Sequence, residues 1–303
     1  MAGETLSRRL EARVSPMAAL VVAILAVSTS AILVRWSGAP PSVAAFYRVL
    51  FTVGLLAPLA FSRHGEDLRS LGRRDALAAA VTGVALALHF AAWFQSVRWT
   101  SVAASVTLVQ SQTLFVAVGA ALYLGERLTL AKLAGIVIAL AGAVVMSLGE
   151  LLGGAVVGPR PLAGNALALV GAVMMAAYVL AGRSLRARVA LVPYVAVVYS
   201  ACAAVLGAIV LVQGSSLLGY EPIEWVLFLA MAVGPGVFGH TVINWALEHV
   251  ESSVVSVSLL GEPVGSTLLA LVLLAEVPGP WTVAGGAVVL TGIYVVARVR
   301  KAA

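Results

Sequence analysis

The sequence predicts an all-α membrane protein with ten transmembrane helices, arranged as two inverted five-helix repeats. Three observations predict this fold class: the composition, the spacing of the apolar runs and a match between the two halves. Of the 303 residues, 61% are hydrophobic and 11% are charged, whereas soluble domains have about 45–50% and about 25%. One aqueous core cannot hide so much apolar surface, so we expect the chain to be surrounded by lipid.

A helix that crosses a bilayer needs roughly 20 apolar residues, and runs of that kind follow one another along the chain with short polar breaks. The ten predicted spans are 17–36, 42–62, 75–97, 101–123, 129–148, 162–182, 191–213, 223–246, 251–274 and 281–298. Their continuous apolar character indicates helices, because strands of an outer-membrane barrel alternate apolar and polar residues.

The spans divide the chain into two repeats with short tails. We expect a cytoplasmic N-terminal tail (1–16), a first repeat (17–148), a linker (149–161), a second repeat (162–298) and a cytoplasmic C-terminal tail (299–303). A cleaved signal peptide is the alternative for the first span. That run is too long for the apolar region of a signal peptide and lacks a clear cleavage site.

The basic residues predict the orientation of the spans. With the N-terminus inside, the cytoplasmic side holds fifteen of them: Arg8, Arg9, Arg13, Arg63, Arg69, Arg73, Arg74, Arg127, Lys132, Arg183, Arg186, Arg188, Arg298, Arg300 and Lys301. The opposite side holds only Arg35, Arg98 and Arg160. This positive-inside bias predicts that both termini are cytoplasmic in a cell (inner) membrane. It assigns the net charge of +6 to topology and to anionic lipid, not to nucleic acid.

The two halves share residues at a nearly constant offset. At 150 residues, Glu126 aligns with Glu276, Gly135 with Gly285 and Gly142 with Gly292; at slightly different offsets, Pro41, Tyr47 and Arg35 align with Pro193, Tyr199 and Arg183. Five helices per repeat is an odd number, so the second copy must enter the membrane from the opposite side, as in secondary transporters. A chance coincidence of glycine and glutamate near helix ends is the alternative.

The same segments resemble a known family. Phe46-Tyr-Arg48, the string from Leu124 to Thr129 (LGERLT) followed by Gly135, and Gly261-Glu-Pro263 are similar to the EamA-type branch of the drug/metabolite transporter (DMT) superfamily, with two repeats over 17–298. Two departures stand out: Thr113 occupies a position where proline is usual, and Ala275 precedes Glu276 where glycine is usual. The resemblance implies a ten-helix transporter of small molecules.

Glu262 is the acidic residue that lies well inside a span. It is eleven residues into the ninth span, or roughly 16 Å along a helix, close to the midplane of the bilayer. Charged groups at this depth are costly and usually face a cavity or a partner. Its repeat counterpart is Gln112, so both side chains are candidates to line one cavity. A structural, protonated carboxyl and an interhelical hydrogen bond remain the alternatives.

Two histidines near mid-span and one arginine also lie inside the predicted spans. His89 and His240 occupy nearly equivalent positions in the two repeats, and each has a large or polar residue four positions later, Trp93 and Asn244. Cavity lining and ordinary packing are both open for them. Arg48 lies inside the second span, where it could extend to the interface, pair with a carbonyl group, or bind a substrate carboxylate or phosphate.

Glycines interrupt the eighth span close to His240. Gly234-Pro-Gly236 and Gly239 predict a hinge or a broken helix there.

Together these residues predict a secondary transporter that works by alternating access. The substrate-binding candidates are Glu262, Gln112, His89, His240, Asn244, Trp93 and Arg48. Amino acids and related polar compounds are the leading substrates, since acidic, basic and amide groups match both signs of charge. The resemblance favours export over import. Transport of drugs, organic anions or sugar phosphates is the alternative.

Catalysis is the alternative from a different class of function. The sequence contains no HExxH or GxSxG motif, so we expect no enzyme activity, catalytic residue, metal or cofactor. No nucleotide-binding motif occurs either, so we do not expect ATP to be the direct source of energy. Proton coupling through Glu262, exchange and facilitated transport all stay open. Whether the protein is a monomer or a homodimer stays open.

Overall fold

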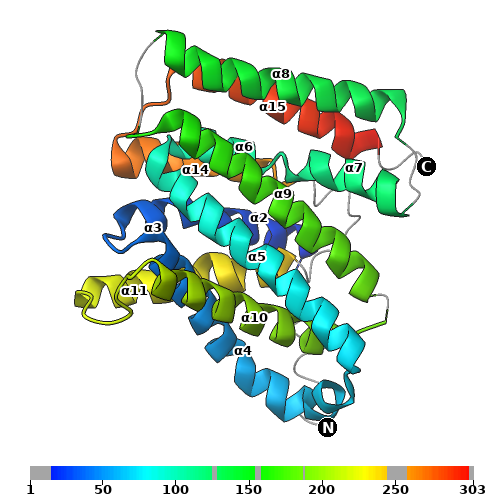
Figure 1. The fold of residues 1–303 in the computed structure, drawn as a ribbon. Helices are drawn as coiled ribbons and strands as arrows, with labels where there is room; N and C mark the ends of the chain where they lie inside the picture. The colour runs from blue at the N-terminus through cyan, green and yellow to red at the C-terminus, as the bar shows by residue number, and fades with distance from the viewer. Residues whose placement is uncertain (1–14, 125–127, 154–157, 187, 244–257, 300–303) are drawn as a thin grey trace.

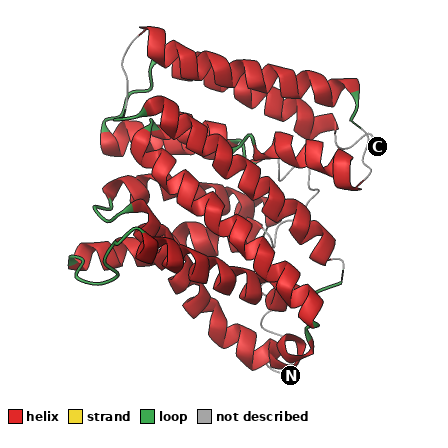
Figure 2. Cartoon of the chain, viewed as in Figure 1, coloured by secondary structure: helices red, strands yellow, loops and turns green. Residues whose placement is uncertain are grey.

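The computed structural model describes residues 15–124, 128–153, 158–186, 188–243 and 258–299. Within these ranges every regular element is a helix (Figure 2). The structure therefore agrees with an all-α fold.

The helices follow the predicted apolar runs closely (Figure 1). They are α2 (Pro16–Ser28), α3 (Ser30–Trp36), α4 (Pro41–Ser70), α5 (Arg73–Trp99), α6 (Val102–Val109), α7 (Gln112–Leu124), α8 (Leu130–Gly153), α9 (Pro161–Arg186), α10 (Leu191–Val212), α11 (Pro222–Met231), η1 (Ala232–Thr241), α14 (Gly261–Leu274) and α15 (Pro280–Val299).

Eight membrane spans are long and apolar enough to be recognised in the described residues, and two shorter apolar helices, Leu130–Met146 and Gly261–Leu274, coincide with the predicted fifth and ninth spans. The chain is thus a multi-pass membrane protein. Ten spans remain a prediction, because residues 244–257 and 154–157, beside those two spans, lie outside the described part.

Two of the predicted spans are each divided into two helices, the first and the fourth. The first is divided at Thr29, whose hydroxyl donates a hydrogen bond of 2.7 Å to the carbonyl of Ala26. The fourth is divided at Gln110 and Ser111, where the Ser111 amide bonds three residues back to Leu108 and so tightens the chain. Such three-residue bonds wind the backbone more tightly than an α-helix. The fourth span therefore changes direction near its middle.

The ninth span turns at the equivalent place. Its described part begins at Ser258, and Leu259 and Leu260 form a turn before α14 starts at Gly261. The Glu262 amide donates to the Leu259 carbonyl at 3.0 Å, again three residues back. Glu262 therefore lies in the first turn of α14, whereas the sequence predicted a position in the middle of one continuous helix.

The eighth span changes its winding where the hinge is predicted. After α11 the chain continues as a π-helix, η1, which contains Pro235. Proline has no backbone N–H to donate to the preceding turn, and π-type windings are frequent at functional sites. The wider winding holds the segment from Gly234 to His240, which contains the three predicted hinge glycines.

The repeat-related glycines pack against one another. Helices α8 and α15 lie side by side at the top of Figure 1. A Cβ added to Gly135 would lie 2.8 Å from the Gly292 carbonyl, and a Cβ added to Gly142 would lie 2.7 Å from the Gly285 carbonyl. Residues without a side chain thus allow the two backbones to touch, a common way for membrane helices to associate.

Other helix contacts occur in matching pairs across the two halves. Helix α5 packs on α9, and α2 packs on η1; α7 packs on α9, and α3 packs on α14. The contact of α2 with η1 joins the repeat counterparts of α9 and α5. The contact of α3 with α14 likewise joins the repeat counterparts of α9 and α7. Helix α4 packs on α5, α10 and η1 as well, so these four elements lie together.

Candidate functional site

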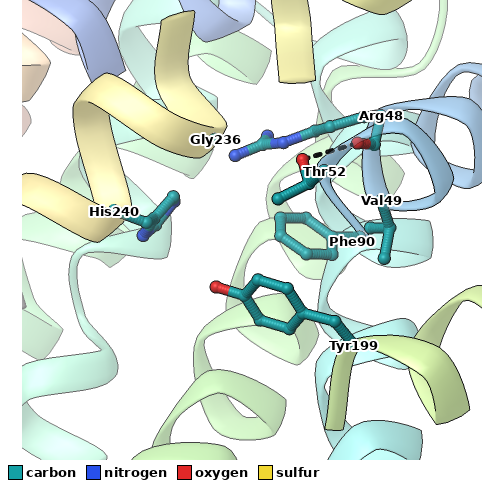
Figure 3. Close-up of a pocket in the computed structure, with 7 residues that line it drawn as sticks. All are labelled: Arg48, Val49, Thr52, Phe90, Tyr199, Gly236 and His240. Atoms are coloured by element: carbon teal, nitrogen blue, oxygen red, sulfur yellow. Dashed lines mark hydrogen bonds between the residues drawn. The ribbon is translucent and has the colours of Figure 1, made fainter. Parts of the chain in front are cut away.

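A narrow pocket lies between α4, α5, α10 and η1 (Figure 3). Its lining residues are Arg48, Val49, Thr52, Phe90, Tyr199, Gly236 and His240. The space open to the centre of a water molecule is about 20 Å³, which is enough for one water molecule. A larger ligand requires the walls to move apart.

Arg48 is the charged group of the pocket. Its side chain is 2% exposed, and its guanidinium Nη1 donates a hydrogen bond of 3.1 Å to the Ser30 hydroxyl. The guanidinium carbon lies 4.6 Å from the centre of the Phe90 ring, a cation–π distance. Arg48 thus extends across the pocket towards η1 (Figure 3) and does not reach for the membrane interface.

Polar groups from three other positions surround this cation. The His240 ring enters from η1, and the Tyr199 hydroxyl points into the same opening from α10 (Figure 3). The Thr52 hydroxyl donates to the Arg48 backbone carbonyl at 2.8 Å, one helical turn earlier. The pocket therefore combines a buried cation, a phenol and an imidazole.

Glu262 is joined to the fourth span by its carboxylate. The Gln110 side-chain amide donates to Glu262 Oε2 at 2.8 Å, and the Gln112 amide donates to Gln110 Oε1 at 3.1 Å. Both glutamines lie at the break between α6 and α7, and Glu262 lies in the first turn of α14. The two broken spans thus meet through a chain of side-chain amides that ends on a carboxylate.

Arg48 and Glu262 are neighbours without touching. The two charges interact electrostatically. Among the described residues, however, no carboxylate oxygen lies within 4.0 Å of an Arg48 nitrogen. In this conformation the two groups therefore form no ion pair.

Small residues hold α14 in place beside α2. The Ser266 hydroxyl donates to the Ser28 carbonyl at 3.0 Å. A Cβ on Gly265 would lie 2.4 Å from Ser28 Oγ. The close approach fixes the first turn of α14, and with it Glu262, next to the centre.

His89 and Trp93 lie behind the pocket, between α5 and α9. The carbonyl oxygen of Gly171 accepts a 2.8 Å hydrogen bond from His89 Nδ1, which must carry the hydrogen because a carbonyl only accepts. The two rings stack at 6.2 Å with an angle of 10° between planes. In this conformation both side chains therefore serve helix packing, one of the two roles that the sequence leaves open.

The seven residues predicted to bind substrate do not all lie in the pocket. Arg48 and His240 line the pocket, and Glu262 and Gln112 form the adjoining amide chain. His89 and Trp93 pack behind them. Asn244 lies outside the described residues.

Sequence reasoning did not single out three residues that the structure brings to the site. Gln110 was not predicted because the offset of 150 residues between the repeats aligns Glu262 with Gln112. Its signal is the polar triplet Gln110-Ser-Gln112 inside an apolar run. Tyr199 was used only as a repeat marker, and Thr52 follows Arg48 by one helical turn, which alone would have placed it on the same face.

A second polar cluster joins the helix ends on the side that the charge bias assigns to the exterior. Arg35 Nη2 lies 3.0 Å from Glu276 Oε2 and donates to the Thr100 carbonyl at 2.6 Å. Glu276 Oε1 accepts from the Val102 amide at 2.5 Å, and the Thr100 hydroxyl donates to Asn165 Oδ1 at 2.8 Å. The ends of the first, third, fourth, sixth and ninth spans are connected in this way.

Glu224 extends the cluster towards the eighth span. Its carboxylate accepts hydrogen bonds of 2.6 Å from the Ser37 hydroxyl and from the Gly38 amide. Arg98 Nη1 donates to the Ser37 carbonyl at 2.7 Å. We call the cluster of Arg35, Ser37, Arg98, Thr100, Glu224 and Glu276 the outer network.

Proteins of known sequence and of known structure resemble this chain over more than half of its length. A protein of Archaeoglobus fulgidus described as an uncharacterized transporter is 34% identical over 196 residues, which cover 62% of this chain and 64% of that protein. The chain thus matches slightly less than two thirds of that relative. A protein of known crystal structure is 25% identical, with a TM-score of 0.64, and the match covers 93% of this chain and 97% of the other.

A family model for EamA-like transporters matches the chain twice, over residues 14–148 and 162–298. The resemblance seen in the sequence motifs is therefore confirmed. Because the two matches take in most of the residues, the chain belongs to the EamA-like transporter family.

Proposed function

We propose that this protein is a secondary transporter that moves small amino-acid-like metabolites across the cell (inner) membrane by alternating access, with both termini cytoplasmic and export as the direction. The observation that carries the proposal is the buried Arg48 facing a central pocket beside Glu262. A zwitterion presents an anionic and a cationic group, which match these two side chains. Membership of a transporter family favours transport over catalysis.

Alternating access rests on two inverted repeats. The glycine contacts support this arrangement, because residue 135 meets 292 while 142 meets 285, and the offset of 150 exchanges the two pairs. A two-fold axis between the halves produces such reciprocal contacts. The breaks in the fourth and ninth spans support it as well, because repeat-related broken helices commonly hold the transport site.

The outer network corresponds to one closed end of the cycle. Arg35 and Glu276 tie three spans together through an ion pair and two hydrogen bonds to backbone groups. Release to the exterior requires these contacts to separate. The sequence offset assigns Arg183 and Glu126 as the counterparts on the cytoplasmic side.

Glu262 is the proposed coupling group. Its carboxylate accepts a hydrogen bond from the neutral amide of Gln110 and interacts electrostatically with Arg48 without contact. A carboxyl so placed can bind a proton when substrate leaves and release it when substrate binds. Transport would then draw on the proton gradient.

The test is transport in proteoliposomes that contain the purified protein. Radiolabelled amino acids are offered one at a time, with and without a pH gradient, to wild type, Glu262→Gln and Glu66→Gln. Glu66 is an exposed residue at the end of α4 and serves as the matched control. Glu262→Gln should lose the effect of the gradient but keep exchange of substrate for substrate, while Glu66→Gln behaves as wild type. Gradient-driven accumulation by Glu262→Gln at the wild-type level would contradict the coupling role.

A further inference from the structure

We propose that Arg48 binds the carboxylate of the substrate and that the pocket between α4, α5, α10 and η1 is therefore an anion subsite. This inference rests on the proposed function and adds that the substrate must carry a carboxylate. The substrates would be small zwitterions whose carboxylate meets Arg48 while the ammonium faces Glu262.

The first argument is the incomplete pairing of a buried charge. A guanidinium has five N–H donors and no acceptor, and a buried charge is costly unless it is paired and hydrogen-bonded. In the described part of the chain Arg48 donates to one neutral hydroxyl, that of Ser30. The Glu262 carboxylate influences its charge but forms no ion pair with it. An anionic ligand would supply the missing acceptors.

The second argument is the fixed orientation of the guanidinium. Its carbon lies 4.6 Å from the centre of the Phe90 ring and 5.7 Å from that of Phe94. The rings limit the positions that the charged group can take, and Tyr199 and His240 line the same pocket (Figure 3). A guanidinium held in this way can offer two parallel N–H groups to a carboxylate, a pairing that lysine cannot reproduce.

The third argument is the wall opposite Arg48. Gly236 lines the pocket from η1, and a Cβ there would lie 2.9 Å from Thr52 Oγ1. Because glycine has no Cβ, it leaves space for an anion on this side of the pocket. In the conformation observed this space admits about one water molecule, so the substrate enters as η1 moves away from α4.

The test compares ligands with and without a carboxylate. A transported amino acid, its carboxamide and its phosphonate analogue compete for uptake in proteoliposomes, and their binding is measured separately in detergent. Wild type should favour the acid over the carboxamide by at least tenfold, because the neutral amide cannot pair with the guanidinium. Arg48→Gln should lose this preference, and Arg48→Lys should retain only part of it.

Two controls keep failure to fold apart from loss of the subsite. Arg69→Gln changes an exposed arginine at the end of the same helix and should leave the preference intact. The ligand comparison on wild type needs no variant, so equal binding of acid and carboxamide by wild type overturns the inference while transport itself stands. A preference for the phosphonate above the acid would also overturn it, in favour of phosphate-bearing substrates. Absence of any amino-acid transport by wild type overturns both the inference and the proposed function.

Discussion

At the scale of single residues, Gly236 decides how close η1 can come to α4. It faces Thr52, whose hydroxyl is already bonded to the Arg48 backbone. The same π-helix contains Gly234, whose added Cβ would meet its nearest atom, Thr29 Oγ1, at an ordinary 3.8 Å. Substitution by alanine can therefore be compared at Gly236, where a neighbour is too close for a methyl group, and at Gly234, where a methyl group fits.

We expect Gly236→Ala to reduce transport strongly and Gly234→Ala to leave it close to wild type. A methyl group 2.9 Å from Thr52 Oγ1 must displace the hydroxyl or fill the space beside Arg48. Overpacking of this kind costs about 1–3 kcal/mol, and a cost of that size on substrate binding corresponds to a loss of about 5- to 150-fold in affinity. Uptake kinetics of both variants check this, and equal KM values would show that the pocket does not contact substrate.

At the scale of elements, the end of α14 carries backbone strain that the sequence explains. Ala275 follows the helix with a φ of +52°, in the left-handed region, and its neighbour Glu276 donates its amide to the Ala270 carbonyl at 3.1 Å. Glycine is the usual residue at this cap because a Cβ is unfavourable there. The family resemblance also expects glycine at this position.

Ala275→Gly should stabilise the protein by about 1 kcal/mol, because glycine adopts the left-handed conformation without the penalty of about 1–2 kcal/mol that an L-residue pays. The midpoint of thermal unfolding in detergent measures the change. Ala232→Gly, in a helix with ordinary negative φ values, is the control and should lower the midpoint. A lower midpoint for Ala275→Gly as well would mean that the cap is not strained.

The breaks in the spans show which parts of the elements were predictable. The interruption near Gly234 follows from Gly-Pro-Gly, since these residues weaken an α-helix locally. No glycine or proline marks the break at Gln110, where Thr113 replaces the usual proline and the polar triplet Gln110-Ser-Gln112 interrupts the apolar run. At that break Gln110 donates a hydrogen bond to Glu262 of the ninth span, a tertiary contact that the local sequence does not reveal. Apolar periodicity therefore predicted the spans but not the positions at which they turn.

At the scale of the whole molecule, two ion pairs connect helix ends on opposite sides of the protein. The Arg35–Glu276 pair belongs to the outer network and has side chains 20% and 8% exposed. The Arg188–Asp75 pair joins the start of α5 to the segment after α9, with side chains 55% and 27% exposed. Breaking a buried pair costs about 3–5 kcal/mol, whereas an exposed pair contributes about 0–1 kcal/mol.

Arg35→Gln should therefore open the outer side, and Arg188→Gln should not. The Val102 amide, which donates to Glu276, reports on the network. Its hydrogen exchange, followed in the peptide that contains it, should accelerate at least tenfold in Arg35→Gln and stay at the wild-type rate in Arg188→Gln. Unchanged exchange in both variants would mean that the network is held together without Arg35.

The site as a whole was predictable only in part, for a physical reason. Charge and polarity inside apolar spans single out Arg48, His240 and Glu262 as costly residues, and these lie around the centre. Which helices face one another is set by tertiary contacts such as the glycine pairs of α8 and α15. Residues with neutral side chains, such as Tyr199, join the site through that packing and leave no distinctive signal in the sequence.

Labelling of a cysteine in the central pocket from the two sides of the membrane tests the account most directly. Cys202, the single cysteine of the chain, is buried, so Cys202→Ala gives a background in which Thr52→Cys is the reporter. A membrane-impermeant thiol reagent should label the reporter when added to either side, in separate experiments, and an amino-acid substrate should protect it. Labelling from one side only, or none from either side even when substrate is cycling, would contradict a central site with alternating access.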